Sequence, residues 1–529
     1  GQCANGWQPV DCGMSARETK LLFSEPRVPV GAWISPHLPA LSRSVESVDG
    51  LAKLMKELHG PQAGLGKSLE AAIIGQERNF FGSLLPFVQK LACEAPKLFP
   101  DGVAVLQRQR DGTRRLSSRQ IASLLACAFF SLLSKVDSVI EKCPELDFAY
   151  VFDRCKTQTQ YLLHYFQRLE EADAAGEFPE RFVDFHRRVV AEEEKKRKFS
   201  NDALLKSNAP LRDFKAHSKG EIQDSKGAIH ADFANEWIGG GALMGGCVQE
   251  EILFMIRPEC LASMLFCEVM APNESIIITG AERFSSYSGY GHTFTWKGDY
   301  RDPTPLDSHK RLRTVIVAFD ALVATSSNQY KMENMQREII KAYAALSFPR
   351  SCFESHAEKG YAFKAFATGN WGCGAFRGHI PLKAMLQWIS ASEAGKGPSL
   401  HTISKQKLRL QFSKQKLRLW WTTAKNEHAR QDDGGITHLT PFFCNNCRYC
   451  ILRLWRRWGA GLGRGDTQAL GGRKDGRVAL EGTRELLRRG GHAWGSLLVP
   501  YRRTGSAAAR EKPRRGPCSR HVRSYAPGV

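Results

Sequence analysis

The sequence predicts an α/β domain preceded by an all-α accessory domain, and three patterns support this prediction. From about residue 46 to 190, apolar residues recur three and four positions apart, which is typical of amphipathic helices. After about residue 200, short β-branched runs alternate with helical patterns, which indicates a mixed, largely parallel sheet flanked by helices. Beyond residue 400 neither periodicity is sustained, so we expect an irregular tail.

The length of 529 residues favours several structural units over one hydrophobic core. We expect a flexible lead-in at 1–45, a helical accessory domain at 46–195, an α/β domain at 196–400 and a basic low-complexity tail at 401–529. Because the chain opens with Gly1 rather than Met, we treat it as a fragment, with Met14 as a candidate start.

Helical spacing is clearest in three stretches of the first half. These stretches are residues 80–99, 117–136 and 157–172. Ser117 and Ser118 are candidate N-caps of the second stretch. The charges of residues 191–199 nearly cancel, so this stretch is predicted to be a solvated helix face or a hinge rather than a binding patch.

The second half alternates strand and helix patterns. The β-branched runs at 274–280 and 313–322 predict strands that are buried on both faces of a sheet. The helical patterns lie at 250–256, 259–270, 334–346 and 381–394. Pro381 opens the last of them, at a position typical of the first residue of a helix.

Positive charge is concentrated in the tail. Residues 401–529 contain 27 Lys and Arg against 8 Asp and Glu, so they carry 19 of the 21 net positive charges. An argument for polyanion binding from net charge therefore applies to the tail alone. There the heptapeptide SKQKLRL occurs twice, and its basic residues precede Trp420 and Trp421, which favours weak nucleic-acid contact.

The cysteines indicate reduced thiols of an intracellular protein rather than a disulfide framework, because most stand singly in apolar stretches. Examples are Cys93, Cys127, Cys267 and Cys352. In the tail, Cys444, Cys447 and Cys450 follow His438 but lack a clear second ligand pair, so we expect no metal site. No apolar run approaches the roughly 18 residues of a membrane span, and we expect neither a membrane contact nor a signal peptide.

The segment ADFANEWIGGGALMGGCVQEEILFMI, residues 231–256, predicts a strand end, a glycine loop and a helix start. In open α/β sheets ligands bind where strands lead into helices, and glycine N–H groups suit a phosphate or a sugar. The spacing of the five glycines does not match the dinucleotide fingerprint. A second glycine loop at 367–378 also follows a predicted strand and could bind a diphosphate. Each loop, taken alone, could also be a tight turn.

Glu250 and Glu251 begin the predicted helix directly after the first glycine loop. Two explanations stay open for acids at this position. They could favour the positive end of the helix dipole, worth roughly 0.3 to 1 kcal/mol. Alternatively, a carboxyl group held away from water there would have a raised pKa and could act as a general acid in glycoside cleavage.

Several motifs in register resemble the poly(ADP-ribose) glycohydrolase family. GGGALMGGCVQEE is similar to the family signature, and DFAN, IITGAERFSSYSGY and ATGNWGCGAF flank it in the family's order. SRQIASLLACAFF is similar to the family's accessory domain, so the resemblance spans roughly residues 50–395. The resemblance implies a macrodomain-like fold. It also implies an enzyme that hydrolyses the ribose–ribose O-glycosidic bonds of poly(ADP-ribose) without a metal or a cofactor.

The resemblance also implies roles for individual residues. Glu251 would be the catalytic acid and base, and Glu250 would orient the ribose hydroxyls. Asp232 would support this site. Tyr290 would stack on or close over the adenosine. The remaining substrate-binding residues would be Ile222, Gln223, Asn235, Gly239, Gly240, Gly241 and Gln249, with Asn370, Gly372, Cys373, Gly374, Ala375 and Phe376 around the diphosphate. One principal acid fits a helix start, because adjacent helical side chains diverge by about 100°.

Simpler structural roles remain open for several of these residues. Tyr290 could be a packed loop aromatic, and Asp232 and Asn235 could form turns near the glycines. His230 is predicted to be a sheet-edge residue rather than a base. Gln223 stands where the family offers a Glu to the adenine, which would alter this contact without excluding it.

The end of the α/β domain departs from the family pattern. An apolar strand is expected after residue 397, but the chain continues PSLHTISKQKLRLQF. A missing strand would expose the edge of its neighbour. Either LHTI or one KLRL copy forms the strand, or the domain is truncated and poorly stable.

The leading hypothesis is an active glycohydrolase that acts as a monomer on poly(ADP-ribose) and poly(ADP-ribosyl)ated proteins, in the nucleus or cytoplasm and in the DNA damage response. One rival is an ADP-ribose-binding module whose altered C-terminal end impairs catalysis. The other rival is a nucleic-acid-binding protein that acts through its basic tail.

Overall fold

The computed structural model describes residues 25–133, 141–325, 327–347, 363 and 365–395, and the backbone of residues 399–403. The SKQKLRL repeats, the tail tryptophans and cysteines, Met14 and Cys352 lie outside the described residues, so the predictions about them stay predictions. Cys93, Cys127 and Cys267 are free thiols, as expected. Within the described ranges, no helix has the length and apolar character needed to cross a membrane.

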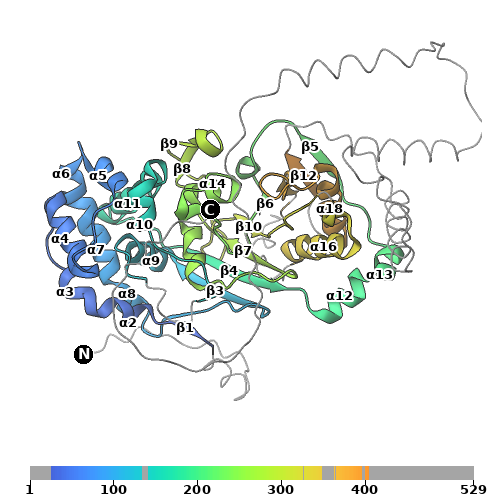
Figure 1. Ribbon diagram of the computed structural model, residues 1–529, viewed down its shortest axis with the longest axis horizontal. Helices are drawn as coiled ribbons and strands as arrows, with labels where there is room; N and C mark the ends of the chain where they lie inside the picture. The colour runs from blue at the N-terminus through green and yellow to red at the C-terminus, as the bar shows by residue number, and fades with distance from the viewer. Residues whose placement is uncertain are drawn as a thin grey trace, which may run out of the picture. The chain divides into compact units, whose positions relative to one another are not determined.

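An eight-stranded mixed sheet forms the centre of the α/β part (Figure 1). Its order is β3-β4-β7-β10-β6-β11-β12-β5, and the four pairs from β10 to β5 are parallel, whereas the other three are antiparallel. The strands are β3 Gly112–Ser117, β4 Phe182–Val189, β5 Phe214–His217, β6 Ala228–Asp232, β7 Glu274–Thr279, β10 Val315–Ala318, β11 Ala365–Thr368 and β12 Ser399–Ile403. This order confirms the predicted mixed, largely parallel sheet.

Helices surround the sheet and form the layer that precedes it in the chain (Figure 1). The helices up to β5 are α4 Val48–His59, α5 Lys67–Ile73, α6 Glu77–Asn79, the π-helical turn η2 Phe80–Leu84, α7 Leu85–Cys93, α8 Ala95–Leu98, α9 Ser118–Phe129, α10 Ala149–Arg154, α11 Lys156–Ala174, α12 Glu192–Phe199 and α13 Asn201–Lys206. Those that follow are η4 Ile222–Asp224, η5 Ala242–Met244, α14 Gln249–Ile256, η6 Pro258–Ala262, α15 Ser263–Phe266, η7 Gly291–Thr293, η8 Asn328–Tyr330, α16 Met332–Leu346 and α18 Ile380–Glu393. Helices are therefore present in the stretches expected at 80–99 and 157–172. The stretch expected at 117–136 is helical over α9, and its residues 134–136 lie outside the described residues.

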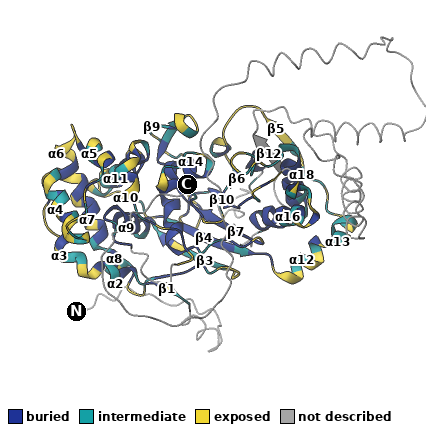
Figure 2. Ribbon diagram, in the orientation of Figure 1, coloured by how far each residue is buried: buried dark blue, intermediate teal, exposed yellow. Residues whose placement is uncertain are grey.

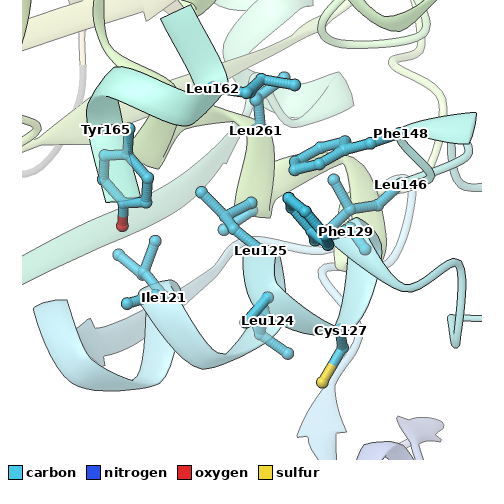
Figure 3. Packing of buried hydrophobic residues seen from close by; sticks show 14 of the residues in the cluster. Ile121, Leu124, Leu125, Cys127, Phe129, Leu146, Phe148, Leu162, Tyr165 and Leu261 are labelled. Carbon is cyan, nitrogen blue, oxygen red and sulfur yellow. The ribbon is translucent and has the colours of Figure 1, made fainter. Parts of the chain in front are cut away.

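The α9 helix shows how the helical layer is built. The Ser117 Oγ accepts a hydrogen bond from the Gln120 N–H at 3.2 Å, and the Gln120 side chain accepts one from the Ser117 N–H at 3.0 Å. This reciprocal cap confirms Ser117 as the N-cap and is worth about 1 kcal/mol. Figure 3 shows Leu125 and Phe129 of α9 packed with Leu162 of α11 and Leu261 of η6.

Alternation along the strands divides the apolar residues of the sheet between two cores. Ile276 and Ile278 belong to the cluster that includes α9, α11 and α14, whereas Ile277, Val315 and Val317 pack with residues of α16 and α18. Both faces of the central strands are therefore covered, and Figure 2 shows these strands buried. Each fully buried aliphatic side chain contributes roughly 1.5 to 3 kcal/mol.

Three predictions about segments need correction. The lead-in at 1–45 is structured from Arg27 onward, because apolar residues of β1 Arg27–Val28, α2 Val30–Ile34 and α3 Leu38–Leu41 are buried in the helical core. The turn η1 Ser35–His37, which has no buried residue, joins α2 to α3. The range 46–195 is not entirely helical: β1 pairs with β2 Val103–Ala104, and β3 and β4 extend the sheet. The helix expected at 259–270 ends at Phe266, because Cys267 forms a bridge with Leu106.

The altered end of the α/β domain still supplies a strand. LHTI lies in β12, which pairs in parallel with β11 on one side and β5 on the other. The sequence left open which segment forms the last strand. The backbone of residues 399–403 shows that LHTI forms it. The edge of β11 is therefore covered by a neighbouring strand.

Candidate active site

Three parallel strands bring the two glycine loops to one edge of the sheet. β6 lies between β10 and β11 and is parallel to both, so the carboxyl ends of all three strands meet. The acid loop, residues 233–248, follows β6, and the second glycine loop, residues 369–378, follows β11. The Trp371 Nε1–H of the second loop donates to the Phe319 carbonyl just beyond β10 at 2.9 Å. This edge is where open α/β sheets bind ligands.

Gln249 is the first residue of α14, and its side chain connects this helix to the end of β6. Its Oε1 accepts from the Phe233 N–H at 2.8 Å, and its Nε2 donates to the Ala231 carbonyl at 3.0 Å. Both polar groups of this amide are thus used by the backbone. Gln249 positions the two glutamates that follow it.

Glu250 holds the beginning of the acid loop. One carboxylate oxygen accepts from the Asn235 N–H at 2.8 Å, and the other accepts from the Gly239 N–H at 2.7 Å. The side chain is buried. Burial raises the pKa of the Glu250 carboxyl well above its usual value, and the charges of Asp232 and Glu251 add to the rise, although the two N–H groups oppose it.

Glu251 holds the end of the same loop. Its Oε1 accepts from the Gly241 N–H at 3.0 Å, and its Oε2 accepts from the Val248 N–H at 2.9 Å. Glu251 as a residue is 7% exposed, so it is buried. The two glutamates are therefore held by different parts of one loop.

Asp232 lies behind the glutamates at the end of β6. It is completely buried, and neither of its carboxylate oxygens has a hydrogen-bond partner among the described residues. Burial raises the pKa of Asp232 well above its usual value, and the Glu251 charge raises it further. Asp232 is therefore not a turn-former, whereas Asn235 is one, because its Oδ1 accepts from the Trp237 N–H at 3.0 Å.

The glycines of the acid loop are required because the carboxylates lie directly against the backbone. A Cβ on Gly240 would lie 2.5 Å from a Glu250 oxygen and 2.8 Å from a Glu251 oxygen, and Gly240 has a φ of +50°. A Cβ on Gly246 would lie 2.7 Å from the Glu251 Cγ. The backbone thus approaches the glutamates more closely than any side chain would allow.

The second glycine loop is folded over a buried tryptophan and a buried lysine. Gly372 has a φ of +68°, and a Cβ there would lie 2.5 Å from the Ala321 Cβ. Lys383 of α18 forms an ion pair with Glu338, and its Nζ lies 4.6 Å from the centre of the Trp371 ring. Burial lowers the pKa of Lys383 to about 7.

The outer part of the second loop is open. Gly374 and Ala375 are exposed, Gly372, Cys373 and Phe376 are half-buried, and the buried Asn370 Oδ1 has no partner among the described residues. The Phe376 carbonyl accepts from the Ala324 N–H at 2.8 Å, which fixes the end of the loop. The predicted diphosphate residues thus lie together in one exposed turn.

Tyr290 approaches the acid loop from the turn between β8 Ser285–Ser288 and β9 Thr295–Asp299. The Gly291 N–H donates to the Cys247 carbonyl at 2.8 Å, which attaches this turn to the acid loop. Tyr290 is 57% exposed, so it is not a packed loop aromatic. Burial of its hydroxyl end nevertheless raises its pKa, opposed by a hydrogen bond with the Gln249 backbone.

Three residues discussed in the sequence analysis, Ile222, Gln223 and His230, make contacts within the protein. The Gln223 Nε2 donates to the Tyr287 hydroxyl at 2.5 Å, and Ile222 is buried in the core beneath the sheet. His230 was expected at a sheet edge, but β6 is an interior strand. Its Nε2 contacts the Ser225 carbonyl at 3.0 Å, and burial lowers its pKa to about 4, so it is a buried neutral histidine.

No role was predicted from the sequence for Val248 or Lys383. Val248 contributes its backbone N–H, which no residue type reveals, and Lys383 acts from the interior of an ordinary helix. The spacing of Val248 and Glu251, three apart at a helix start, is the one signal available, because a glutamate there reaches back to the N-cap N–H. Over the described ranges, no group of three His, Cys, Asp or Glu could hold a metal ion.

A separate cavity of about 480 Å³ lies between the start of α9 and β4, away from the glycine loops. Its cationic side chains are already paired. Arg119 contacts Glu94 and Asp173, and Arg181 contacts Glu259 and Glu282. This cavity includes none of the predicted site residues.

Two family models match the chain. Residues 201–410 match "Poly (ADP-ribose) glycohydrolase (PARG), Macro domain fold", and residues 75–187 match the helical domain of the same family. The fold and the site therefore define a macrodomain-fold protein with a preceding helical domain. "Probable poly(ADP-ribose) glycohydrolase 2" of Arabidopsis thaliana is 33% identical over 393 residues, which cover 63% of this chain and 74% of that protein. The chain belongs to the poly(ADP-ribose) glycohydrolase family.

Two further likenesses differ in strength. "Poly(ADP-ribose) glycohydrolase 1" of Arabidopsis thaliana is 31% identical over 399 residues, covering 60% of this chain and 71% of that protein. The solved poly(ADP-ribose) glycohydrolase of Deinococcus radiodurans, in complex with ADP-ribose, is 14% identical with a TM-score of 0.23, over 46% of this chain and 94% of that chain. The second likeness is too weak to carry any part of the assignment.

Proposed function

We propose that this glycosidase hydrolyses the ribose–ribose O-glycosidic bonds of poly(ADP-ribose) and releases ADP-ribose, with Glu251 as the general acid and then the general base. The observation that carries this proposal is the position of the Glu251 carboxyl group. It is buried and held by the Gly241 and Val248 N–H groups, at the sheet edge that also presents the second glycine loop.

The neighbouring carboxyl groups supply the protonation state that this chemistry needs. Burial and mutual repulsion raise the pKa of Glu250 and Asp232, so both carboxyl groups favour the protonated form beside Glu251. A site that favours protonated carboxyl groups suits general-acid catalysis.

The reaction then follows two steps. Glu251 gives its proton to the departing ribose oxygen while the bond from this oxygen to the anomeric carbon breaks, leaving an oxocarbenium-like centre. The Glu251 carboxylate next takes a proton from water, and the water oxygen bonds to the anomeric carbon. The enzyme returns to its starting state, and one bond has been replaced by two hydroxyl groups.

The other site residues hold the substrate. Glu250 orients the ribose hydroxyls, while Gly372 to Phe376 surround the diphosphate with backbone N–H groups. Tyr290 is exposed beside the acid loop, which supports contact with the adenosine. Gln249 and Gln223 are engaged within the protein, so they support the site by positioning its backbone and the Tyr287 hydroxyl.

The variant Glu251→Gln tests the role of the acid. It keeps the size of the side chain and an oxygen that can accept one of the two backbone hydrogen bonds, but it cannot act as the general acid, so we expect turnover to fall by roughly 1000-fold or more. ADP-ribose affinity, measured by calorimetry, should stay within a few-fold of the parent. Glu236→Gln is the matched control, because Glu236 is an exposed glutamate of the same loop. Substantial turnover by Glu251→Gln would remove Glu251 from this role.

The rival function is an ADP-ribose-binding module without activity. Its motivation was a missing strand at the end of the domain, and β12 occupies that position. An assay for ADP-ribose release from poly(ADP-ribose) separates the two functions. Action on poly(ADP-ribosyl)ated proteins, nucleic-acid contact through the tail, a monomeric state and location in the nucleus or cytoplasm stay predictions.

A further inference from the structure

Exposed apolar side chains gather around the acid loop. Eight large apolar side chains are exposed in the described ranges, and five of them lie on this loop or beside it. The five are Tyr150, Trp237, Met244, Val248 and Tyr290, with exposed fractions between 38% and 58%. Single exposed apolar residues are ordinary, whereas a group of them beside a candidate site marks a contact surface.

The helical part of the protein contributes Tyr150 to this group. Tyr150 lies on α10, and a Cβ on Gly245 of the acid loop would be 3.8 Å from the Tyr150 Cε1. Gly245 follows Met244, which is 58% exposed. A hydrogen bond also holds this part of the acid loop against the helical part, since the Gln158 Nε2 of α11 donates to the Gly246 carbonyl at 3.3 Å. Tyr150 therefore lies beside Gly245, the chain neighbour of the exposed Met244, and we call Tyr150 and Met244 together the α10 platform.

The α10 platform and Tyr290 belong to different elements. Tyr290 is attached to the loop through the bond from the Gly291 N–H to the Cys247 carbonyl, whereas Tyr150 contacts the loop at Gly245. The two aromatic side chains thus reach the acid loop from separate segments of the chain. A single adenosine on Tyr290 leaves the α10 platform without a ligand.

The proposed substrate supplies a second flat ring. Every ribose–ribose bond of poly(ADP-ribose) joins two ADP-ribose units, so an adenine is present on each side of the bond to be cleaved. A purine stacks well on tyrosine, and the thioether of methionine packs favourably against aromatic rings. The platform also carries no charge that would repel the phosphates.

We propose that the α10 platform binds the adenine of the second ADP-ribose unit, on the far side of the cleaved bond from the unit held by Tyr290. This inference rests on the proposed function and assigns to the helical domain a part in recognising the polymer. The platform gives affinity for a chain of two or more units. Binding of free ADP-ribose does not involve it.

The test compares one and two units on an inactive background. In Glu251→Gln, an ADP-ribose dimer should bind roughly 10-fold more tightly than ADP-ribose, and adding Tyr150→Ala should remove this advantage without changing ADP-ribose affinity. Tyr150→Phe should keep the advantage, because the ring remains. Ile74→Ala is the matched control, since Ile74 is 71% exposed on the helical part.

The outcomes separate this inference from the proposed function. An unchanged dimer advantage in Tyr150→Ala, or an equal loss of affinity for both ligands, overturns the platform. A parent protein that releases no ADP-ribose overturns the proposed activity, while the binding ratio still tests the platform. In the active protein, Tyr150→Ala should raise KM for the polymer and leave kcat unchanged.

Discussion

The acid loop and the second glycine loop are alike in sequence and opposite in electrostatics. Both are rich in glycine and follow neighbouring parallel strands. In the acid loop, the backbone N–H groups point at the protein's own carboxylates, Glu250 and Glu251. In the second loop, the backbone is folded over the cationic Lys383, and Gly374 is exposed. The first loop is therefore suited to handling protons, and the second to binding an anion.

The charges behind the second loop extend this contrast. Lys383 pairs with Glu338, which also pairs with Arg337, and Asp320 pairs with Arg337 and Lys341. With all five groups ionised, three cations face two carboxylates. The set therefore has a net positive charge beside the turn proposed to hold the diphosphate. The surroundings of the acid loop are the reverse, since no ion pair is seen in the described ranges for the buried carboxyl groups of Asp232, Glu250 and Glu251.

Among changes to the two loops themselves, the largest expected effect is the loss of turnover when the acid loop is altered. Gly240→Ala would place a Cβ against both glutamate carboxylates, at a residue whose φ of +50° disfavours a side chain. We expect kcat to fall by roughly 100-fold, because a displacement of about 1 Å at a catalytic group has this cost. Gly64→Ala is the control, since a Cβ on Gly64 meets nothing within 4 Å. An unchanged kcat in a folded Gly240→Ala protein would contradict the close contact.

The matching change in the second loop should affect binding instead. Gly372→Ala would bring a Cβ within 2.5 Å of the Ala321 Cβ and strain a backbone with φ +68°, so the turn must move. We expect the Kd for ADP-ribose and the KM to rise roughly 10-fold, with kcat nearly constant. Calorimetry and steady-state kinetics measure the two quantities. A fall in kcat at unchanged KM would remove the distinction between the loops.

A smaller effect should appear in the pH dependence of binding. The pKa of Lys383 is lowered to about 7 by burial and by the charge of Arg337. The ammonium form therefore predominates below about pH 7 and is lost above it, so ADP-ribose affinity should rise a few-fold as pH falls from about 8.5 to about 6. Lys383→Met should flatten this profile, because it removes the titrating cation. A profile that stays equally steep in Lys383→Met would assign the dependence to other groups.

The contrast between the loops was only partly predictable from the sequence. The glycine runs, the adjacent glutamates and the buried strands are local patterns, so the sheet edge and the acid pair followed from them. The strands β3 and β4 were missed because their residues mix charged and apolar types within a range dominated by helical spacing. Such residues form strands because they pair with strands that are distant in the sequence. The local spacing of apolar residues does not reveal this pairing.

Electrostatic roles were harder to predict than positions. The raised pKa was expected for an acid beside the glycine loop, and it is present on Glu250 and Asp232. A turn role for Asp232 was left open beside its expected supporting role, because it precedes a loop, yet it is the last residue of a buried strand. The role of Lys383 depends on its contact with Trp371, which folding alone creates.

The smallest expected effect is a gain in stability from removing a buried ionisable group. Because the folded state raises the pKa of Asp232, the folded protein retains a proton that the unfolded chain releases, and this penalty grows as pH rises above the ordinary value near 3.8. Asp232→Asn removes the ionisable group and should raise the free energy of unfolding by about 1 kcal/mol at neutral pH. Turnover should fall at the same time, since Asp232 is a buried neighbour of the two glutamates and its carboxyl group contributes to the raised pKa of Glu250. Thermal unfolding near pH 4 should show almost no difference between the two proteins, and a gain of the same size at both pH values would mean that packing, rather than charge, distinguishes Asp232 from asparagine.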